Sequence, residues 1–499
     1  VDAFVIVSSA GEPLTVALAG LTQDITLTSA RRAAATTYTR ITSQVSLDST
    51  VGRGQNSTEA RMQAIQNEKP DIILLVGGVD DGAESPVIEM VNMIAMALQI
   101  VPEARNPSII FAGNKATQPQ VTDILQPVAR LTLVDNVRPT LDTENLAPVQ
   151  LELEKLYSHY RMSRLAGFEK LQNWSPTAIT PASRSFEKFI AFLGQHHRSN
   201  VIGMDVGSRS TVVATQARDH QNTTIRTDAG VGHSLAALLN RVPVERIRRW
   251  LPFEVEPDEL HNRLLNRSLH PGGLPTTHEQ LHLDHAIARE ALRLVVEQAQ
   301  SSWRSDTSSG RYAIQWRMMI GAGRILTHVP QPGYAAQTML DGLEPWGVTQ
   351  LLLDTNGVTN VLGALAAVEP VAAVEVATNK ETLLKLGTVI APLGHGPANS
   401  TALHLTIRES SEISTEFEIS YGSILVIPLP PDKKVTLEMR PSRYFDIGLG
   451  QPGRGAVAEV SGGVLGLIVD ARGRPLRLPT DDGIRQEKLA KWLTALGVS

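Results

Sequence analysis

The sequence predicts an α/β protein that ends in a smaller β-rich region. Short runs of β-branched or aliphatic residues end in Gly or another small residue, as buried parallel strands do. Helical patterns lie between these runs, and after Pro392 the pattern changes to short alternating strands punctuated by Pro and Gly. Alternating strands and helices form a sheet covered on both faces, whose ligands bind beyond the carboxyl ends of the strands.

Five of the predicted strands are each followed directly by small or polar residues. They are Ile72 to Val76 before Gly77-Gly78, Ile109 to Phe111 before Ala112-Gly113-Asn114, Val201 to Met204 before Asp205, Met318 to Ile320 before Gly321, and Leu351 to Leu353 before Asp354. We therefore look for ligand-binding residues in these turns.

The chain of 499 residues has the length of about three domains. We expect one α/β lobe over residues 1–195 and a second over 196–392. A run rich in Gly, Pro and polar residues then leads to a β-rich domain over 400–499, which closes with a short helix. The chain opens at Val1 almost directly on a strand-like segment, so we expect the first lobe to lack its N-terminal portion.

Composition excludes several classes of function. The formal net charge of -5 is too mild for collecting nucleic acid. Cysteine is absent, which excludes disulfides and thiolate zinc sites and fits a reducing, cytoplasmic location. Every apolar stretch is far shorter than the roughly 20 residues that a membrane span needs. The sequence thus predicts no nucleic-acid partner and no membrane span.

The turn from Asp205 to Thr211 is the sharpest local motif. It reads Asp205-Val206-Gly207-Ser208-Arg209-Ser210-Thr211 and directly follows a strand. Gly207 lets backbone amides approach a phosphate, the hydroxyls of Ser208, Ser210 and Thr211 can donate to its oxygens, and Asp205 can hold magnesium through water. A tight hairpin with no ligand explains the same residues, so both interpretations stay open at this point.

A second turn, Gly321-Ala322-Gly323, also follows a strand. Bare backbone at these positions could lie flat against an adenine or a ribose. Close packing of a helix on the strand also explains the motif. By itself this turn favours the packing interpretation.

Three further motifs point to structure rather than chemistry. His278-Glu279-Gln280-Leu281-His282 matches a zinc-peptidase pattern, but Thr276 and Glu279 form a capping box, so we interpret it as a solvated helix start and expect no zinc. The carboxylates of Asp80 and Asp81 could ligate a cation or cap a helix that begins near Ser85, and we favour the cap. The stretch from Asp470 to Pro475 is expected to be a hairpin tip, whose two arginines could meet an acidic partner but are expected to be solvated.

Many short matches in one order give the chain a resemblance to a known family. They are Ser8 to Gly11, Ala19 to Leu21, Ser29 to Ala33, Leu74 to Gly78, Ala112 to Asn114, Asn136 to Pro139, Pro176-Thr177, the Asp205 turn, and Arg226-Thr227 with Gly230. Over about residues 3 to 392 the chain resembles the glutamate mutase accessory family called MutL or GlmL, which is unrelated to the mismatch-repair protein of similar name.

The resemblance implies a two-lobed actin-like ATPase fold, of the ribonuclease H-like kind, shared with sugar kinases and heat-shock chaperones. It implies that Asp205 to Thr211 is the second phosphate loop and Gly321 to Gly323 the adenosine loop, with ATP and Mg²⁺ as cofactors. It also implies an accessory chaperone that reactivates a cobalamin-dependent mutase, with the mutase subunits as partners. Closure of two lobes around ATP would be the switch, and a homo-oligomer is compatible with the sequence.

Departures from the family pattern weaken the prediction of catalysis. The family loop reads Asp-x-Gly-Gly-x-Thr-Thr-Asp, whereas here Ser208 replaces the second glycine, Arg209 intrudes, and Val212 stands where the last aspartate is expected. The first phosphate loop of the family would precede Val1. The resemblance therefore favours nucleotide binding over hydrolysis, and its alternative is an actin-like scaffold or assembly protein that has lost ATPase activity.

Overall fold

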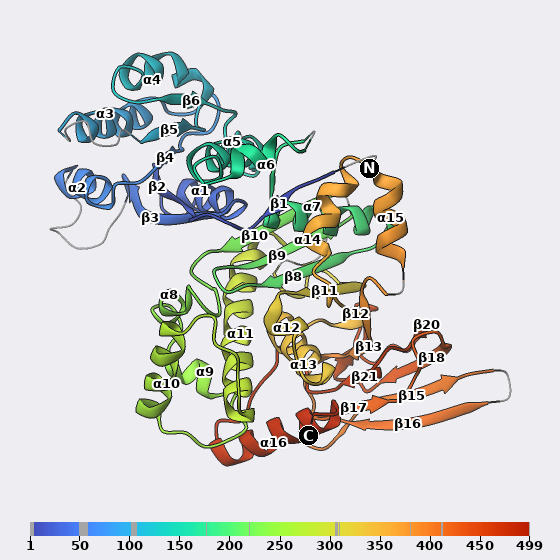
Figure 1. Cartoon of the computed structure of the whole chain (residues 1–499). Helices are drawn as coiled ribbons and strands as arrows, with labels where there is room; N and C mark the ends of the chain where they lie inside the picture. The colour runs from blue at the N-terminus through green and yellow to red at the C-terminus, as the bar shows by residue number, and fades with distance from the viewer. Residues whose placement is uncertain are drawn as a thin grey trace. The chain divides into compact units, whose positions relative to one another are not determined.

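The computed structural model describes residues 4–48, 58–100, 107–175, 177–218, 220–304, 308, 310–379, 381–410 and 413–498. They form two compact units (Figure 1). Unit 2 contains residues 8–178 and 224–227, and unit 1 contains the first seven residues with 179–223 and 228–499. Pro176, one of the residues that carry the family resemblance, lies outside the described residues.

Unit 2 is built on a five-stranded sheet that is parallel throughout. Its strand order is β3-β2-β4-β5-β6, with bounds β2 (Leu14–Gly20), β3 (Thr39–Ser46), β4 (Ile72–Leu75), β5 (Ser108–Phe111) and β6 (Leu131–Leu133). The chain thus starts at β2, moves to β3 on one side, and then crosses to β4 on the other. This is a doubly wound order with its switch point between β2 and β4, where such sheets bind ligands.

The helices of unit 2 lie between and after these strands. They are α1 (Thr26–Ala35), α2 (Thr58–Glu68), α3 (Ser85–Ile100), α4 (Gln118–Leu125), α5 (Ala147–Tyr157) and α6 (Phe168–Gln172). Of these, α3 and α4 pack on the apolar core. One core cluster joins β4 and β5 to α3, where Ile73 and Phe111 share it with Met90 and Ile94. These strands read as continuous apolar runs because both faces of a parallel sheet are buried.

Unit 1 contains an eight-stranded mixed sheet in the order β10-β9-β8-β11-β12-β13-β21-β17. The bounds are β8 (Val201–Val206), β9 (Thr211–Ala217), β10 (His220–Arg226), β11 (Met318–Ala322), β12 (Gly347–Leu353), β13 (Leu384–Ala391), β17 (Ile424–Ile427) and β21 (Gly466–Asp470). An antiparallel meander is therefore followed by two strands parallel to β8. This arrangement agrees with the predicted ribonuclease H-like lobe, and the all-parallel sheet of unit 2 differs from it.

The helices of unit 1 precede these strands, lie between them or follow them. They are α7 (Ala182–His197), α8 (Leu235–Leu239), α9 (Val244–Arg248), α10 (Pro257–Leu269), α11 (His278–Ala299), α12 (Arg324–Thr327), α13 (Pro332–Leu343), α14 (Thr359–Ala366), α15 (Pro370–Thr378) and α16 (Asp482–Ala495). The predicted boundary near residue 195 falls inside α7. The structure instead divides the chain at residue 178, because α7 packs on β8, β9 and α14.

The predicted α/β class and β-rich C-terminal region are both confirmed. The C-terminal region contains a four-stranded antiparallel sheet, β16-β15-β18-β20, with bounds β15 (Thr401–Arg408), β16 (Ser414–Ser420), β18 (Lys434–Pro441) and β20 (Ala456–Ser461). Its other two long strands, β17 and β21, extend the large sheet of unit 1. No helix of the described residues is both long and apolar enough to span a bilayer.

A buried network of salt bridges connects the residues at the end of β21 to helices α11 and α13 of unit 1. Arg472 donates to Asp470 at 2.8 Å and to Asp341 of α13 at 2.7 Å. Arg474 donates to Asp470 at 2.6 Å, and Arg289 of α11 donates to Asp341 at 2.8 Å. The prediction of solvated arginines at this turn is wrong: the side chains of Arg472 and Arg474 are both 0% exposed.

Glu344, at the end of α13, gives this region a pH dependence. Burial would raise the pKa of its carboxyl, but Arg311, Arg474, Arg293 and the Tyr312 hydroxyl outweigh burial and lower the pKa from 4.5 to about 2. Because the folded pKa is depressed, the stabilisation is present above the unfolded pKa and is lost as the pH falls through the folded one. At neutral pH it amounts to about 3 kcal/mol.

We therefore expect Glu344→Gln to be less stable than the unmodified protein at pH 7, and the difference to shrink between pH 4.5 and about 2. Urea unfolding of both proteins across this pH range measures the difference in their free energy of unfolding. A difference in the free energy of unfolding that stays constant with pH would contradict the assignment.

Candidate active site

The carboxyl ends of three neighbouring parallel strands bring the predicted site residues together. In the register of β8 and β11, Asp205 lies opposite Ala322 and Met204 opposite Gly321. Gly321 in turn lies opposite Leu353 of β12, and the backbone N–H of Asp354 donates to the Gly321 carbonyl at 2.8 Å. The Asp205 turn, the Gly321 turn and Asp354 thus share one edge of the sheet, although their strands are far apart in sequence.

The Asp205 turn connects β8 to β9 as a hairpin. The N–H of Gly207 donates to the carbonyl of Ser210 at 2.9 Å and closes the turn. The segment from Ala229 to Ser234 braces it, since the carbonyl of Gly207 accepts from Val231 N at 3.1 Å and that of Ser208 accepts from Gly232 N at 3.1 Å. This bracing fixes the backbone shape of the turn before any ligand arrives.

The three hydroxyls predicted to face a phosphate differ in availability. Thr211 is fully buried, and its hydroxyl already donates to the carbonyl of Ala229 at 2.6 Å. Ser208 Oγ lies 2.7 Å from His233 Nδ1 and accepts from the His233 backbone N–H at 3.0 Å. Ser210 is half-buried at the start of β9. In this arrangement Thr211 serves to position the turn, and Ser208 and Ser210 are the hydroxyls at its surface.

Asp205 is half-buried beside two groups that sequence reasoning did not assign to the site. Asn360 of α14 donates through Nδ2 to Asp205 Oδ2 at 3.2 Å. Desolvation by the surrounding protein raises the pKa of the Asp205 carboxyl, the Asn360 hydrogen bond lowers it, and the negative charge of Asp354 raises it further. A cation at this edge would stabilise both carboxylates.

Asp354 itself caps α14. Its carboxylate accepts from the backbone N–H groups of Val358 and Thr359, each at 2.9 Å, and from the Thr359 hydroxyl at 2.5 Å. This cap fixes the first turn of α14 and with it Asn360. The predicted strand Leu351 to Leu353 is followed directly by Asp354, and this was the signal in the sequence that could have identified Asp354 and, through its cap on α14, Asn360.

The Gly321 turn packs directly against the Asp205 turn. Gly323 has φ +92°, and a Cβ at this position would lie 2.3 Å from the carbonyl oxygen of Val206. A Cβ on Gly321 would meet Met339 Sδ at 2.9 Å, and Ala322 is buried. Both glycines are therefore needed for close packing, which is the simpler of the two interpretations of this motif, whether or not a nucleoside also lies there.

The zinc-peptidase pattern is a helix start with its cap shifted by one residue. Thr277 Oγ1 accepts from Gln280 N at 3.2 Å, and Gln280 Oε1 accepts from Thr276 N at 2.8 Å, so the predicted pair of Thr276 and Glu279 is wrong. Glu279 is instead paired with Arg263 at 2.9 Å. Desolvation, Arg289 and His278 lower the pKa of His282 to about 4. Among the described residues there is no group of three or more His, Asp and Glu that could hold a metal ion.

The turn after β4 in unit 2 does not cap the next helix as predicted. Asp80 Oδ1 accepts from Lys115 N at 3.1 Å and from Asn136 Nδ2 at 3.0 Å. Gly77 and Gly78 line a hollow of about 170 Å³ at the switch point of the sheet, with mostly apolar neighbours such as Leu21 and Val79. Sequence reasoning found these glycines but not the hollow, because strand order is not encoded in the local pattern.

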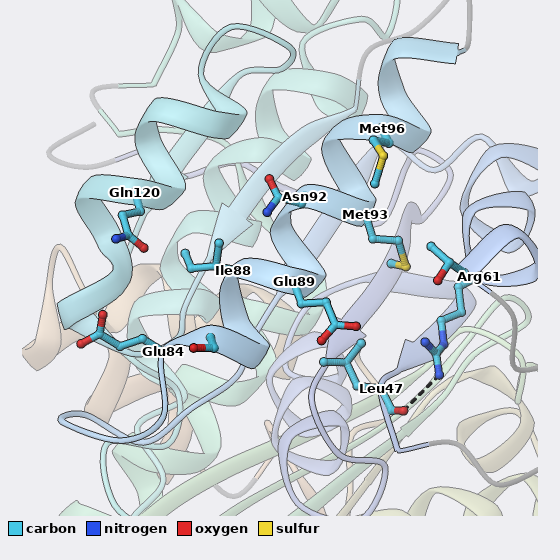
Figure 2. A pocket seen from close by; sticks show the side chains of 11 residues that line it. Leu47, Arg61, Glu84, Ile88, Glu89, Asn92, Met93, Met96 and Gln120 are labelled. Atoms are coloured by element: carbon cyan, nitrogen blue, oxygen red, sulfur yellow. Dashed lines mark hydrogen bonds between the residues drawn. The ribbon is translucent and has the colours of Figure 1, made fainter.

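A larger hollow of about 620 Å³ lies on the helices of unit 2. Figure 2 shows Ile88, Met93 and Met96 of α3 along it, with Arg61 of α2 reaching the carbonyl of Leu47 at 3.0 Å. Glu84 and Glu89 also line it. Its mixed lining presents no constellation of catalytic side chains.

Comparisons with known proteins agree with the resemblance seen in the sequence. The model of the family described as MutL protein matches residues 1–380. Protein MutL of Clostridium tetanomorphum is 23% identical over 355 residues, which are 65% of this chain and 73% of that protein.

Solved structures resemble the chain only weakly. Component A of the (R)-2-hydroxyglutaryl-CoA dehydratase of Acidaminococcus fermentans is 12% identical, with 40% of this chain and 71% of that chain covered and a TM-score of 0.23. Ta0583, an archaeal actin homolog, is 14% identical, with 56% and 75% covered and a TM-score of 0.21. These likenesses carry no argument about the site. The family model spans most of the sequence, and on that ground the chain belongs to the MutL protein family.

Proposed function

We propose that the protein binds ATP at the edge formed by β8, β11 and β12, and acts as an accessory, reactivating chaperone for a cobalamin-dependent mutase of the glutamate mutase type. The observation that carries the nucleotide site is the meeting of the Asp205 turn and the Gly321 turn at adjacent strand ends. The family membership supports the accessory role, with mutase subunits as the partners.

The residues at this edge fit magnesium and a phosphate group. Asp205, Asp354 and Asn360 are oxygen donors of the kind that Mg²⁺ prefers, directly or through water. Asn360 Oδ1 is buried and has no hydrogen-bond partner among the described residues. Bound Mg²⁺ would neutralise charge on the phosphates, while the backbone amides at the tip of the Asp205 turn and the hydroxyls of Ser208 and Ser210 would hold their oxygens.

The experiment is calorimetric titration of the protein with magnesium ATP. We expect saturable binding that Asp205→Ala weakens by about tenfold or more, because a carboxylate beside the metal is lost. Asp123→Ala, at an exposed position of α4, is the control and should bind like the unmodified protein. Absence of binding, or equal binding by Asp205→Ala in a folded protein, would refute the site.

A second candidate is a non-hydrolysing scaffold of the same fold. Val212 favours it, because this buried residue pairs with Asp205 across the hairpin where the family loop carries an aspartate. With Val212 in that place, the hairpin lacks the second carboxylate that could orient water beside Asp205. Steady phosphate release from ATP that disappears in Asp205→Ala would exclude the scaffold. A cytoplasmic location and a homo-oligomer remain predictions.

A further inference from the structure

Unit 1 contains a hollow of about 200 Å³ that shares no residue with the proposed nucleotide site. Three arginines from different elements line it: Arg249 just after α9, Arg293 on α11 and Arg485 on α16. The rest of the wall is apolar or aromatic, with Trp250 beside Arg249 and with Leu476 and Leu478 from the segment before α16. No carboxylate stands in the lining, so the hollow presents positive charge on an apolar background.

The acidic partners of these arginines are each shared with a second arginine. Glu290 accepts from Arg249 at 2.6 Å and from Arg246 at 2.8 Å. Glu344 accepts from Arg293 at 2.6 Å and from Arg311 at 2.9 Å. Asp482 is paired with Arg485 and Arg248, both at 2.5 Å. Around Glu344 and Asp482, one carboxylate shared between two guanidinium groups leaves part of the positive charge uncompensated, whereas Arg246 also pairs with Glu297 at 3.1 Å.

Each of the three arginines also has a buried donor without an acceptor. The Nε atoms of Arg249, Arg293 and Arg485 are buried and have no hydrogen-bond partner in the part of the chain that the structure describes. A buried N–H that lacks an acceptor destabilises a fold, and native proteins rarely leave several at one place. Because these Nε atoms are buried, a ligand in the hollow does not reach them, and the groups it meets are the partly exposed side chains of Arg249 (33%) and Arg293 (17%).

The aromatic wall holds the arginines in place. The guanidinium carbon of Arg249 lies 5.1 Å and that of Arg293 lies 5.8 Å from the centre of the Trp250 ring, within the range of cation–π contact. Trp250 is 3% exposed, and its Nε1 donates to Glu290 at 2.7 Å. The guanidinium planes are thus positioned before any ligand binds, which favours affinity.

We propose that this hollow is a binding site for a small organic oxyanion, that is, a phosphate or carboxylate group that carries a compact apolar substituent. Guanidinium groups match both oxyanions in charge and in geometry. A dry cavity of about 150 Å³ holds a benzene ring, so the apolar wall leaves room for a substituent of that order. The oxyanion pairs with the arginine side chains that line the hollow, and the substituent lies against Trp250, Leu476 and Leu478.

The test is titration of the full-length protein with phenyl phosphate, inorganic phosphate and benzoate, at constant ionic strength set with chloride. Calorimetry measures binding, and tryptophan fluorescence reports on Trp250. We expect one saturable site per chain, with phenyl phosphate tighter than inorganic phosphate. Tighter binding of phenyl phosphate than of benzoate would identify the group as phosphate, and the reverse order as carboxylate.

Lysine substitutions isolate the role of the guanidinium groups. Arg249→Lys and Arg485→Lys keep the charge but lose the planar guanidinium fork that matches an oxyanion, so each is expected to weaken binding about tenfold or more. Arg263→Lys is the matched control, since Arg263 pairs with Glu259 and Glu279 and does not line the hollow. Failure of all three compounds to bind the folded protein, or equal weakening by Arg263→Lys, would overturn the proposal. Neither result would affect the ATP titration.

Discussion

Asp470→Asn is expected to lower the free energy of unfolding by about 3–5 kcal/mol, because it leaves buried arginines without their carboxylate. Asp470 is wholly buried at the end of β21 and accepts from both Arg472 and Arg474. Asparagine keeps the shape and removes the charge. The two arginines hold the pKa of Asp470 well below its usual range against the opposing effect of burial. Urea unfolding of the two proteins at neutral pH measures the difference.

Glu438→Gln is the control for this prediction. Glu438 pairs with Arg408 at 2.7 Å on the β15–β18 face, where the arginine side chain is 47% exposed. Exposed pairs of this kind contribute about 0–1 kcal/mol. If both variants lost the same small amount of stability, the network around Asp470 would not fasten the end of β21 as described.

Gly363→Ala is expected to have the second large effect, with a loss of about 3 kcal/mol through overpacking. Gly363 lies on α14 where this helix crosses α7, and an added Cβ would lie 1.7 Å from the carbonyl oxygen of Ser185. The Ser185 hydroxyl also accepts from Ala364 N at 2.8 Å, so the two helices cannot separate without losing this bond. Thermal unfolding and urea unfolding both measure the loss.

The same substitution should disturb the proposed nucleotide site, because Asn360 lies one turn earlier on α14 and contacts Asp205. Gly272→Ala is the matched control: nothing lies within 4 Å of its added Cβ. That change should alter stability by no more than about 0.5 kcal/mol. A Gly363→Ala protein as stable as Gly272→Ala would show that α7 and α14 tolerate a wider separation.

The strands of the fold were predictable because a strand that is buried on both faces appears in the sequence as a continuous apolar run. Ile72–Leu75 and Val201–Val206 appear as apolar runs that end in small or acidic residues. Their order in the sheets was not predictable from local patterns. The all-parallel sheet of unit 2 and the place of β21 beside β13 depend on pairings between segments far apart in sequence.

The candidate site was predicted in part for the same reason. Asp205 and Gly321 each follow a predicted strand, and adjacency of the strands brings them together. The partners of individual side chains were not predictable: Arg472 was expected in solvent, whereas Asp341, 131 positions away, binds it in the core. Likewise Thr211 was expected to face a phosphate, but its hydroxyl donates a hydrogen bond to the carbonyl of Ala229 instead.

The position of β21 has a consequence for the order of events during synthesis. The long strand β13 pairs on one side with β12 and on the other with β21, so this second edge has no partner until residues 466–470 have been synthesised. An unpaired edge invites contact with other chains. Nascent molecules therefore pass through a stage in which the four strands of the β15–β20 sheet can already pair, while the edge of β13 is unpaired and open to contact with other chains.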